Sequence, residues 1–177
     1  MGTQRDDGGQ AGPDTDSAPG PAAKGAPQPL WFEDLEPGLV FRSPERVISA
    51  GDIAAFSRLS GDHNPIHTDE ELARASAFRG TVAHGHLVQA VASGLAWDLG
   101  IFRGTLVALT GIEIDFVAPV RPDTAVRLEL TVCAREASPR PRRGAVKFTA
   151  RVLDGDDTPI IEGAWRTLMG RRPKATS

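Results

Sequence analysis

A short polar segment in the first half of the chain carries the side chains best suited to acid–base chemistry. Residues 60–67 read SGDHNPIH, which sets Asp62 and His67 five positions apart. Pro65 restricts the residue before it to extended conformations, so we expect a stiffened turn rather than a helix. Such a turn leaves room for one water or one substrate between a carboxylate and an imidazole. A histidine titrates near neutral pH, and a carboxylate can give or take a proton when burial raises its pKa.

This pair suits the addition of water across the double bond of an α,β-unsaturated thioester. That reaction needs a base to activate the water, a proton donor for the α-carbon and a group that holds the enolate oxygen. Residues 83–87 read AHGHL and stand at the start of an apolar run. Free N–H groups and the helix dipole point outward at a helix start. Gly85 has no side chain to keep a thioester oxygen from its N–H, and such a donor is worth on the order of 10²–10³ in rate.

The first half of the chain is expected to hold these residues on helices. Ser49 precedes a short helix that we expect to end near Leu59. Thr68, followed three residues later by Glu71, predicts a capping box for a second helix. Residues 86–97 are apolar nearly all round and rich in small side chains. That pattern is typical of a helix that is buried on most sides.

The second half of the chain changes to a period of two from about Thr105. A long strand is predicted over residues 106–116, and apolar residues then alternate with polar ones over 126–132 and 146–152. A last strand follows over residues 161–167. Strands that alternate in this way have one covered face. A mostly buried helix followed by an antiparallel meander indicates an α+β fold, with a sheet wrapped around a central helix.

Composition limits the domain organisation and the class of protein. The 177 residues are 40% hydrophobic, enough for one globular domain that needs no disulfide or structural metal. Residues 2–29 contain no large aliphatic or aromatic side chain. We therefore expect a disordered tail over residues 1–29, a folded domain over 30–170 and a short basic fringe over 171–177.

Charge and hydropathy exclude several classes of partner. The formal net charge of −3 argues against nucleic-acid binding. No apolar run is long enough to cross a bilayer, and no apolar signal segment begins the chain. We therefore expect a cytoplasmic protein with no membrane partner. The one cysteine, Cys133, lies in an alternating apolar run and is read as a small core or strand residue.

Three motifs taken together resemble the MaoC-like family. They are SGDHNPIH at 60–67, FRG at 78–80 and AHG at 83–85, with further similarity at 31–38 and 115–120. The resemblance covers most of the chain from Trp31 to about Gly170. The run Gly-Asp-x-Asn-Pro-x-His is specific, and far stronger than any two of its residues alone. The best-known members of the family are R-specific enoyl-CoA hydratases with the hotdog fold.

The resemblance implies a role for each matching residue. Asp62 and His67 would be the catalytic acid–base pair, and Asn64 would support the geometry of the site. The N–H of Gly85 would bind the thioester carbonyl. The family fold implies a homodimer with its site at the subunit interface. His86 departs from the family, which usually places an apolar residue at this position, often Met.

A metal site is the main alternative reading of the same residues. All four histidines lie between His63 and His86, and a zinc ion could use them together with Asp62. No cysteine joins them, however, and the hydration reaction needs no metal. We therefore expect neither a metal nor a cofactor, and we expect His84 to hold the loop to the start of the helix.

The function predicted from the sequence is that of a hydro-lyase. It is the reversible hydration of a trans-2-enoyl thioester, of coenzyme A or an acyl carrier protein, to an (R)-3-hydroxyacyl thioester. One alternative is a hotdog acyl-CoA thioesterase, which also needs an activated water and an oxyanion donor. The other is a non-catalytic subunit that binds acyl-CoA.

Overall fold

The computed structural model describes residues 28–137 and 142–174. The tail expected over residues 1–29 lies outside these ranges except for its last two residues, and so do residues 175–177 of the expected fringe. The elements in chain order are η1 (Phe32–Asp34), β1 (Val40–Arg42), β2 (Arg46–Ile48), α1 (Ala50–Ser60), α2 (Pro65–Thr68), α3 (Glu70–Ala75), α4 (Gly85–Asp98), β3 (Leu106–Phe116), β4 (Thr124–Ala137), β5 (Arg143–Asp154) and β6 (Pro159–Gly170).

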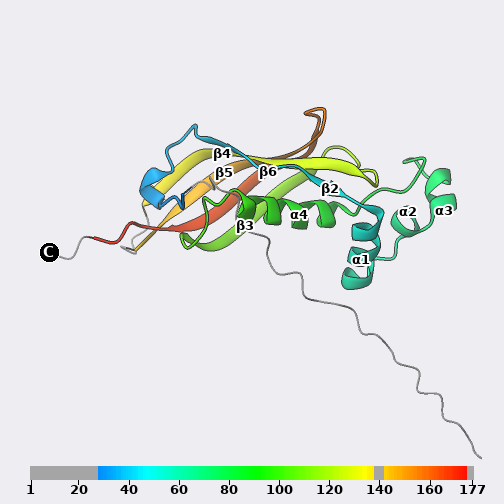
Figure 1. The fold of residues 1–177 in the computed structure, drawn as a ribbon, viewed down its shortest axis with the longest axis horizontal. Coiled ribbons are helices and arrows are strands. Elements are labelled where there is room, and N and C mark those ends of the chain that lie inside the picture. The colour runs from blue at the N-terminus through cyan, green and yellow to red at the C-terminus, as the bar shows by residue number, and fades with distance from the viewer. Residues whose placement is uncertain (1–27, 138–141, 175–177) are drawn as a thin grey trace, which may run out of the picture.

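The strands form one antiparallel sheet, and its order is β1-β4-β5-β6-β3. The short strand β2 also pairs with β4, beyond the end that pairs with β1. α4 lies along one face of the sheet, as Figure 1 shows. The predicted α+β arrangement of a sheet around a long helix is therefore confirmed. β3 is an edge strand, because β6 is its one partner in the described part of the chain.

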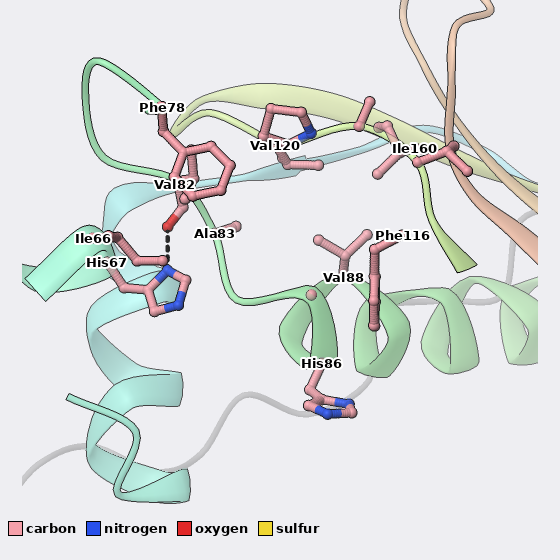
Figure 2. A pocket seen from close by; sticks show the side chains of 14 residues that line it. Ile66, His67, Phe78, Val82, Ala83, His86, Val88, Phe116, Val120 and Ile160 are labelled. Atoms are coloured by element: carbon pink, nitrogen blue, oxygen red, sulfur yellow. Dashed lines mark hydrogen bonds between the residues drawn. The ribbon is translucent and has the colours of Figure 1, made fainter. Parts of the chain in front are cut away.

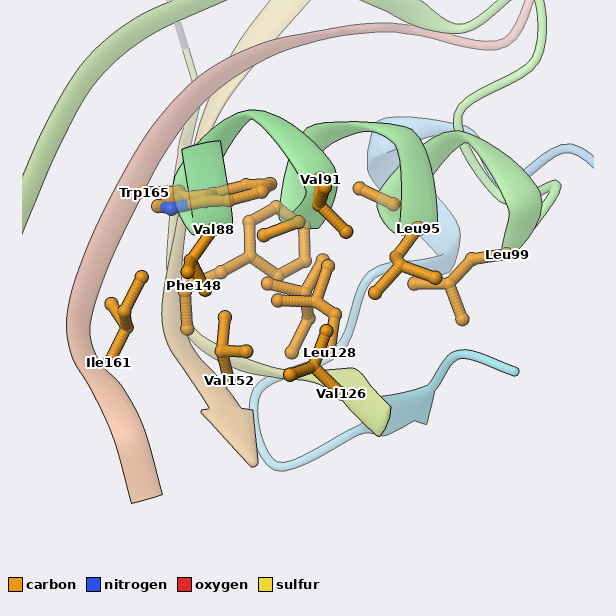
Figure 3. Close-up of a cluster of buried hydrophobic side chains, with 14 of the residues drawn as sticks. Val88, Val91, Leu95, Leu99, Val126, Leu128, Phe148, Val152, Ile161 and Trp165 are labelled. Carbon is orange, nitrogen blue, oxygen red and sulfur yellow. The ribbon is translucent and has the colours of Figure 1, made fainter. Parts of the chain in front are cut away.

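The core lies between α4 and the sheet (Figure 3). Alternate residues of β4 and β5 turn toward the helix, and among them Leu128, Leu130 and Phe148 are fully buried. They pack with Val88, Leu95 and their neighbours on α4. Each such side chain contributes about 1.5–3 kcal/mol when it leaves water. This packing fixes α4 on the sheet and thereby fixes the position of its N-terminus.

The three short helices gather at one end of the sheet, near the start of α4 (Figure 1). Ser49, which precedes the predicted helix, caps α1: its hydroxyl accepts a hydrogen bond from the N–H of Asp52, whose carboxylate accepts from the N–H of Ser49. α1 ends at Gly61, which takes the left-handed conformation with φ of 77°. Glycine reaches this region without steric penalty, so the chain can turn sharply into the polar segment.

Three local expectations were wrong. Residues 65–68 form a short helix rather than a loop, because the fixed φ of Pro65 suits the first position of a helix. The cap of α3 is Asp69 and not Thr68, since the Asp69 carboxylate accepts from the N–H of Leu72 at 3.0 Å. Trp97, the last residue of the run expected to be buried on most sides, is 56% exposed on α4.

The ends of the described chain meet at η1. Arg171 and Arg172, expected as a basic fringe, pair with Glu33 and Asp34 respectively.

None of the helices within the described ranges is both long and apolar enough to cross a bilayer.

Candidate active site

The structure brings Asp62, His67 and His84 together. One ligand-type atom from each lies within 4.8 Å of the others. Asp62 is exposed, His67 is half-buried and His84 is buried. The pairing of Asp62 with His67 follows the arrangement expected from their spacing, whereas His84 reaches them from the start of α4.

Asp62 is held by hydrogen bonds on both sides of its peptide. Its carboxylate accepts from the N–H of Asn64 at 3.2 Å, and its own N–H donates to the hydroxyl of Ser60 at 3.2 Å. Its carbonyl oxygen accepts twice, from the hydroxyl of Ser57 at 2.7 Å and from Nε2 of His84 at 3.0 Å. These bonds leave the second carboxylate oxygen of Asp62 with no partner among the described residues.

Ser57 is the member of this site that sequence reasoning missed. It lies on α1, its side chain is buried, and its hydroxyl also contacts Nδ1 of His63 at 3.0 Å. The one available signal was a serine on the buried face of an amphipathic helix. The pattern does not indicate its partner, because that partner is a backbone carbonyl.

The hydrogen bonds of His67 determine which of its ring nitrogens is free. Nδ1 lies 2.7 Å from the carbonyl oxygen of Val82, as the dashed line in Figure 2 shows. A carbonyl only accepts, so Nδ1 must be the donor. In the neutral ring the proton therefore sits on Nδ1, and Nε2 keeps its lone pair. The ring stacks on that of His84, with centroids 3.8 Å apart and planes 28° apart.

His84 joins the polar turn to α4. It occupies the N-cap position of that helix, and its Nε2–H donates to the carbonyl of Asp62 by the same argument. Its other nitrogen, Nδ1, is buried with no partner among the described residues. The ring of Phe56 packs against it from α1, with centroids 5.1 Å apart. His84 is thus fixed by contacts on two of its faces, from His67 and from Phe56.

Gly85 begins α4 beside a pocket of about 440 Å³. A Cβ atom at this position would lie 2.6 Å from the ring of Phe116, so no larger residue fits without a shift. No side chain caps the helix here, which leaves the first N–H groups of α4 free for a ligand. The other lining residues are mostly apolar: Ile66, His67, Phe78, Val82, Ala83, His86, Val88, Val117, Ala118, Pro119, Val120 and Ile160. Asp62 stands outside this lining, next to His67.

A second set of bonds fixes the loop that carries Val82. The hydroxyl of Thr81 donates to the carboxylate of Glu70, and this bond lowers the pKa of Glu70 below its ordinary value. The N–H of Val82 donates to Ile66 at 3.1 Å, and that of Ala83 donates to a carbonyl of the β3–β4 connection at 2.7 Å. The acceptor for His67 therefore has its own position fixed by both α2 and α3.

The same three polar residues are a possible donor set for a metal ion. Asp62, His67 and His84 each offer one ligand atom within the 4.8 Å spacing. One nitrogen of each histidine is already bonded to a carbonyl, so a metal ion would have to take the remaining nitrogens. Chemically, the arrangement offers a neutral imidazole base, a nearby carboxylate and free helix N–H groups around one apolar pocket.

Comparison with known proteins places this chain in a family. The model of the MaoC like domain matches residues 35–153. The chain is 33% identical over 135 residues to a 3-hydroxybutyryl-CoA dehydratase of Methylorubrum extorquens, covering 76% of this chain and 80% of that protein. It is 34% identical over 108 residues to the (R)-specific enoyl-CoA hydratase of Aeromonas caviae, covering 60% and 78%.

The chain also resembles a longer relative and proteins of known structure. The protein MaoC of Klebsiella aerogenes is 34% identical over 121 residues, but the match spans only 35% of that protein and 68% of this chain. A Mycobacterium tuberculosis protein described as having a double hotdog fold superimposes with a TM-score of 0.70 at 22% identity, covering 84% of this chain and 46% of that one. The fold is therefore the hotdog fold, and this chain belongs to the MaoC-like family.

Proposed function

We propose that this protein is a hydro-lyase that reversibly hydrates trans-2-enoyl thioesters, of coenzyme A or an acyl carrier protein, to (R)-3-hydroxyacyl thioesters. The domain that carries this activity would span residues 30–170. The main support is the meeting of Asp62 and His67 beside the uncapped start of α4 at Gly85. The names of the relatives, a dehydratase and an R-specific hydratase, support the same reaction.

The proposed mechanism assigns the first proton transfer to His67. Its Nε2 removes a proton from water as the water oxygen bonds to C3 of the substrate. The electron pair of the double bond moves toward the thioester oxygen, where the N–H of Gly85 holds the developing enolate. The imidazolium then passes this proton to the Asp62 carboxylate, which delivers it to C2. Both side chains thereby return to their starting forms, and the reverse sequence removes water.

Supporting roles go to Asn64 and His84. The side chain of Asn64 caps α2 by accepting from the N–H of Ile66 at 3.3 Å, and its N–H binds the Asp62 carboxylate. His84 stacks on His67 and binds the Asp62 carbonyl. Each of these contacts orients one member of the acid–base pair, which is the precondition for efficient proton transfer.

We also propose that the protein is a homodimer that pairs through β3. This strand has an open edge within the described structure, and unpaired edges that expose apolar residues favour association. The exposed apolar residues of this side lie on β3, just after it, and on α4: Leu106, Val107, Leu109, Ile112, Phe116, Val117 and Trp97. Light scattering should give the wild-type protein twice the mass of one chain. The Ile112→Lys variant should have the mass of a single chain. A wild-type mass of one chain would contradict the dimer.

The test of the activity is incubation with crotonyl-CoA. Hydration removes the conjugated enoyl absorbance and releases no thiol. Release of free thiol would indicate the thioesterase alternative instead. Binding of acyl-CoA with no turnover, even at high protein concentration, would favour the non-catalytic subunit. Chiral analysis of the 3-hydroxybutyryl product tests the R configuration.

A further inference from the structure

Two buried polar side chains near the pocket have no partner. Gln89 on α4 is 9% exposed, and neither its Nε2 nor its Oε1 has a hydrogen-bond partner among the described residues. Trp165 on β6 is 4% exposed, and its indole Nε1 also has no hydrogen-bond partner among the described residues. Burying an amide or an indole N–H without a hydrogen bond is unfavourable. These atoms therefore point to a ligand that supplies the missing partners.

Gln89 lies on the side of α4 that faces β3 and β6. Gly85, Gln89 and Ser93 are spaced four residues apart and so share one face of the helix. Gly85 borders the 440 Å³ pocket, and Ser93 borders a second pocket of about 100 Å³. Gln89 lines neither pocket, but it lies on the helix between Gly85 and Ser93, about 6 Å along the axis from Gly85.

Trp165 lies on the same side of the helix. It lines the second pocket together with Ser93, and Figure 3 shows its ring against α4 near Val88, which lines the first pocket. The indole of Trp165 thus borders the second pocket on the side of the helix that carries Gln89. The remaining residues of the second pocket are apolar except for one threonine: Ala96, Trp97, Phe102, Leu106, Leu109 and Thr167.

The chemistry of these walls selects the kind of group that could bind there. No Asp, Glu, Lys or Arg is among the residues that line either pocket in the described structure. In the second pocket, which has no histidine either, a buried carboxylate or ammonium would therefore lack a counter-charge. A hydroxyl group fits better, because it accepts from the indole N–H or the amide NH₂ and donates to the amide oxygen.

We infer that Gln89 and Trp165 recognise a hydroxyl group carried by the acyl chain beyond the reacting double bond. The inference rests on the proposed function, which places the thioester oxygen at the N–H of Gly85. An acyl chain that extends from there along the stripe of α4 brings its later carbons level with Gln89. The substrate class is then a hydroxylated enoyl thioester, rather than one with a plain alkyl chain.

The test compares enoyl thioesters that differ only in a hydroxyl in place of a terminal methyl group. One pair is 6-hydroxy-trans-2-hexenoyl-CoA with trans-2-heptenoyl-CoA, and a shorter pair is 5-hydroxy-trans-2-pentenoyl-CoA with trans-2-hexenoyl-CoA. For the wild-type protein, kcat/KM should favour the hydroxylated member of at least one pair by roughly tenfold or more. Gln89→Leu should reverse that preference, and Trp165→Phe should reduce it. The matched control is Gln28→Leu, which makes the same chemical change at an exposed position far from Gln89 in the sequence. It should leave the preference for the hydroxylated substrate unchanged.

The outcomes separate this inference from the proposed function. Hydration of crotonyl-CoA without a preference in either pair would overturn the inference and leave the function intact. A Gln89→Leu variant that is more stable yet keeps the wild-type preference would also overturn it, because the amide would then have no contact with substrate. Failure to hydrate any of the substrates would overturn the proposed function, and this inference with it.

Discussion

The sheet and the helical end of this molecule are held together in different ways. In β4, β5 and β6 the backbone is paired residue by residue, and alternate side chains are buried against α4. From α1 to the start of α4 the chain is largely exposed, and side chains that bind backbone atoms fix its shape. Ser57, His67 and His84 each bind a backbone carbonyl there.

The difference suggests that stability and chemistry reside in separate parts of the molecule. Ladder hydrogen bonds and apolar burial contribute most to folding free energy, but they offer no reactive group to a substrate. Exposed polar turns contribute little to stability and can therefore hold a carboxylate and an imidazole at a pocket. Substitutions in the two regions should accordingly affect different measurements.

The largest expected effect is on stability, from Phe148→Ala in β5. Phe148 is fully buried and packs edge to face on Phe102, with ring centroids 5.7 Å apart. Its removal leaves a cavity, so the free energy of unfolding should fall by about 3–5 kcal/mol, measured by urea denaturation. The turnover of the folded fraction should change little, because the polar turn is untouched. Phe148→Leu should lose clearly less stability, and an equal loss would contradict the cavity argument.

The opposite behaviour is expected from Asp62→Asn and His67→Gln. Each should lower turnover of crotonyl-CoA by at least about 10², since one positioned acid or base is typically worth that much. Neither should shift the melting temperature much, because Asp62 is exposed and His67 half-buried. The matched control is Asp98→Asn, which makes the same chemical change at the far end of α4 and should retain activity. Full activity in either site variant would refute the proposed mechanism.

The two regions also differ in how well the sequence predicts them. The strand predicted over residues 106–116 has the bounds of β3, and the alternation predicted over residues 146–152 lies in β5, where buried side chains alternate with less buried ones. Ser57 was missed because its partner is a carbonyl, which any residue supplies. Thr68 and Asp69 compete for one cap, and the pattern does not decide between neighbours. Trp97 falls in a run expected to be buried, because a buried and an exposed apolar residue on the same helix look alike in sequence.

A smaller effect is expected from Ser57→Ala, which tests whether side-chain bonds to the backbone position the site. The Asp62 carbonyl would keep only the bond from His84. Such a bond contributes about 1 kcal/mol, so we expect kcat for crotonyl-CoA to fall roughly fivefold with little change in KM. Ser43→Ala removes a comparable bond of a buried serine, to the carbonyl of Pro44, away from the site. It should match the stability loss without the loss of kcat, and an equal loss of kcat would make Ser57 merely structural.

The smallest expected effect is that of Asp52→Ala at the start of α1, and it depends on pH. The N–H and hydroxyl of Ser49 donate to the Asp52 carboxylate and, with help from Arg46, hold its pKa below the ordinary value of 3.8. The folded protein therefore binds this proton less readily than the unfolded chain does, so the contribution is complete above about pH 4 and is lost as the pH falls through the lowered pKa. Urea unfolding near neutral pH should show a loss of about 1 kcal/mol in the variant. The difference from wild type should shrink in acid, whereas turnover near neutral pH should hold, because the cap stabilises α1 without touching Asp62. If the difference persists unchanged in acid, the carboxylate's charge is not what Ser49 stabilises, and the helical end is held by neutral hydrogen bonds alone.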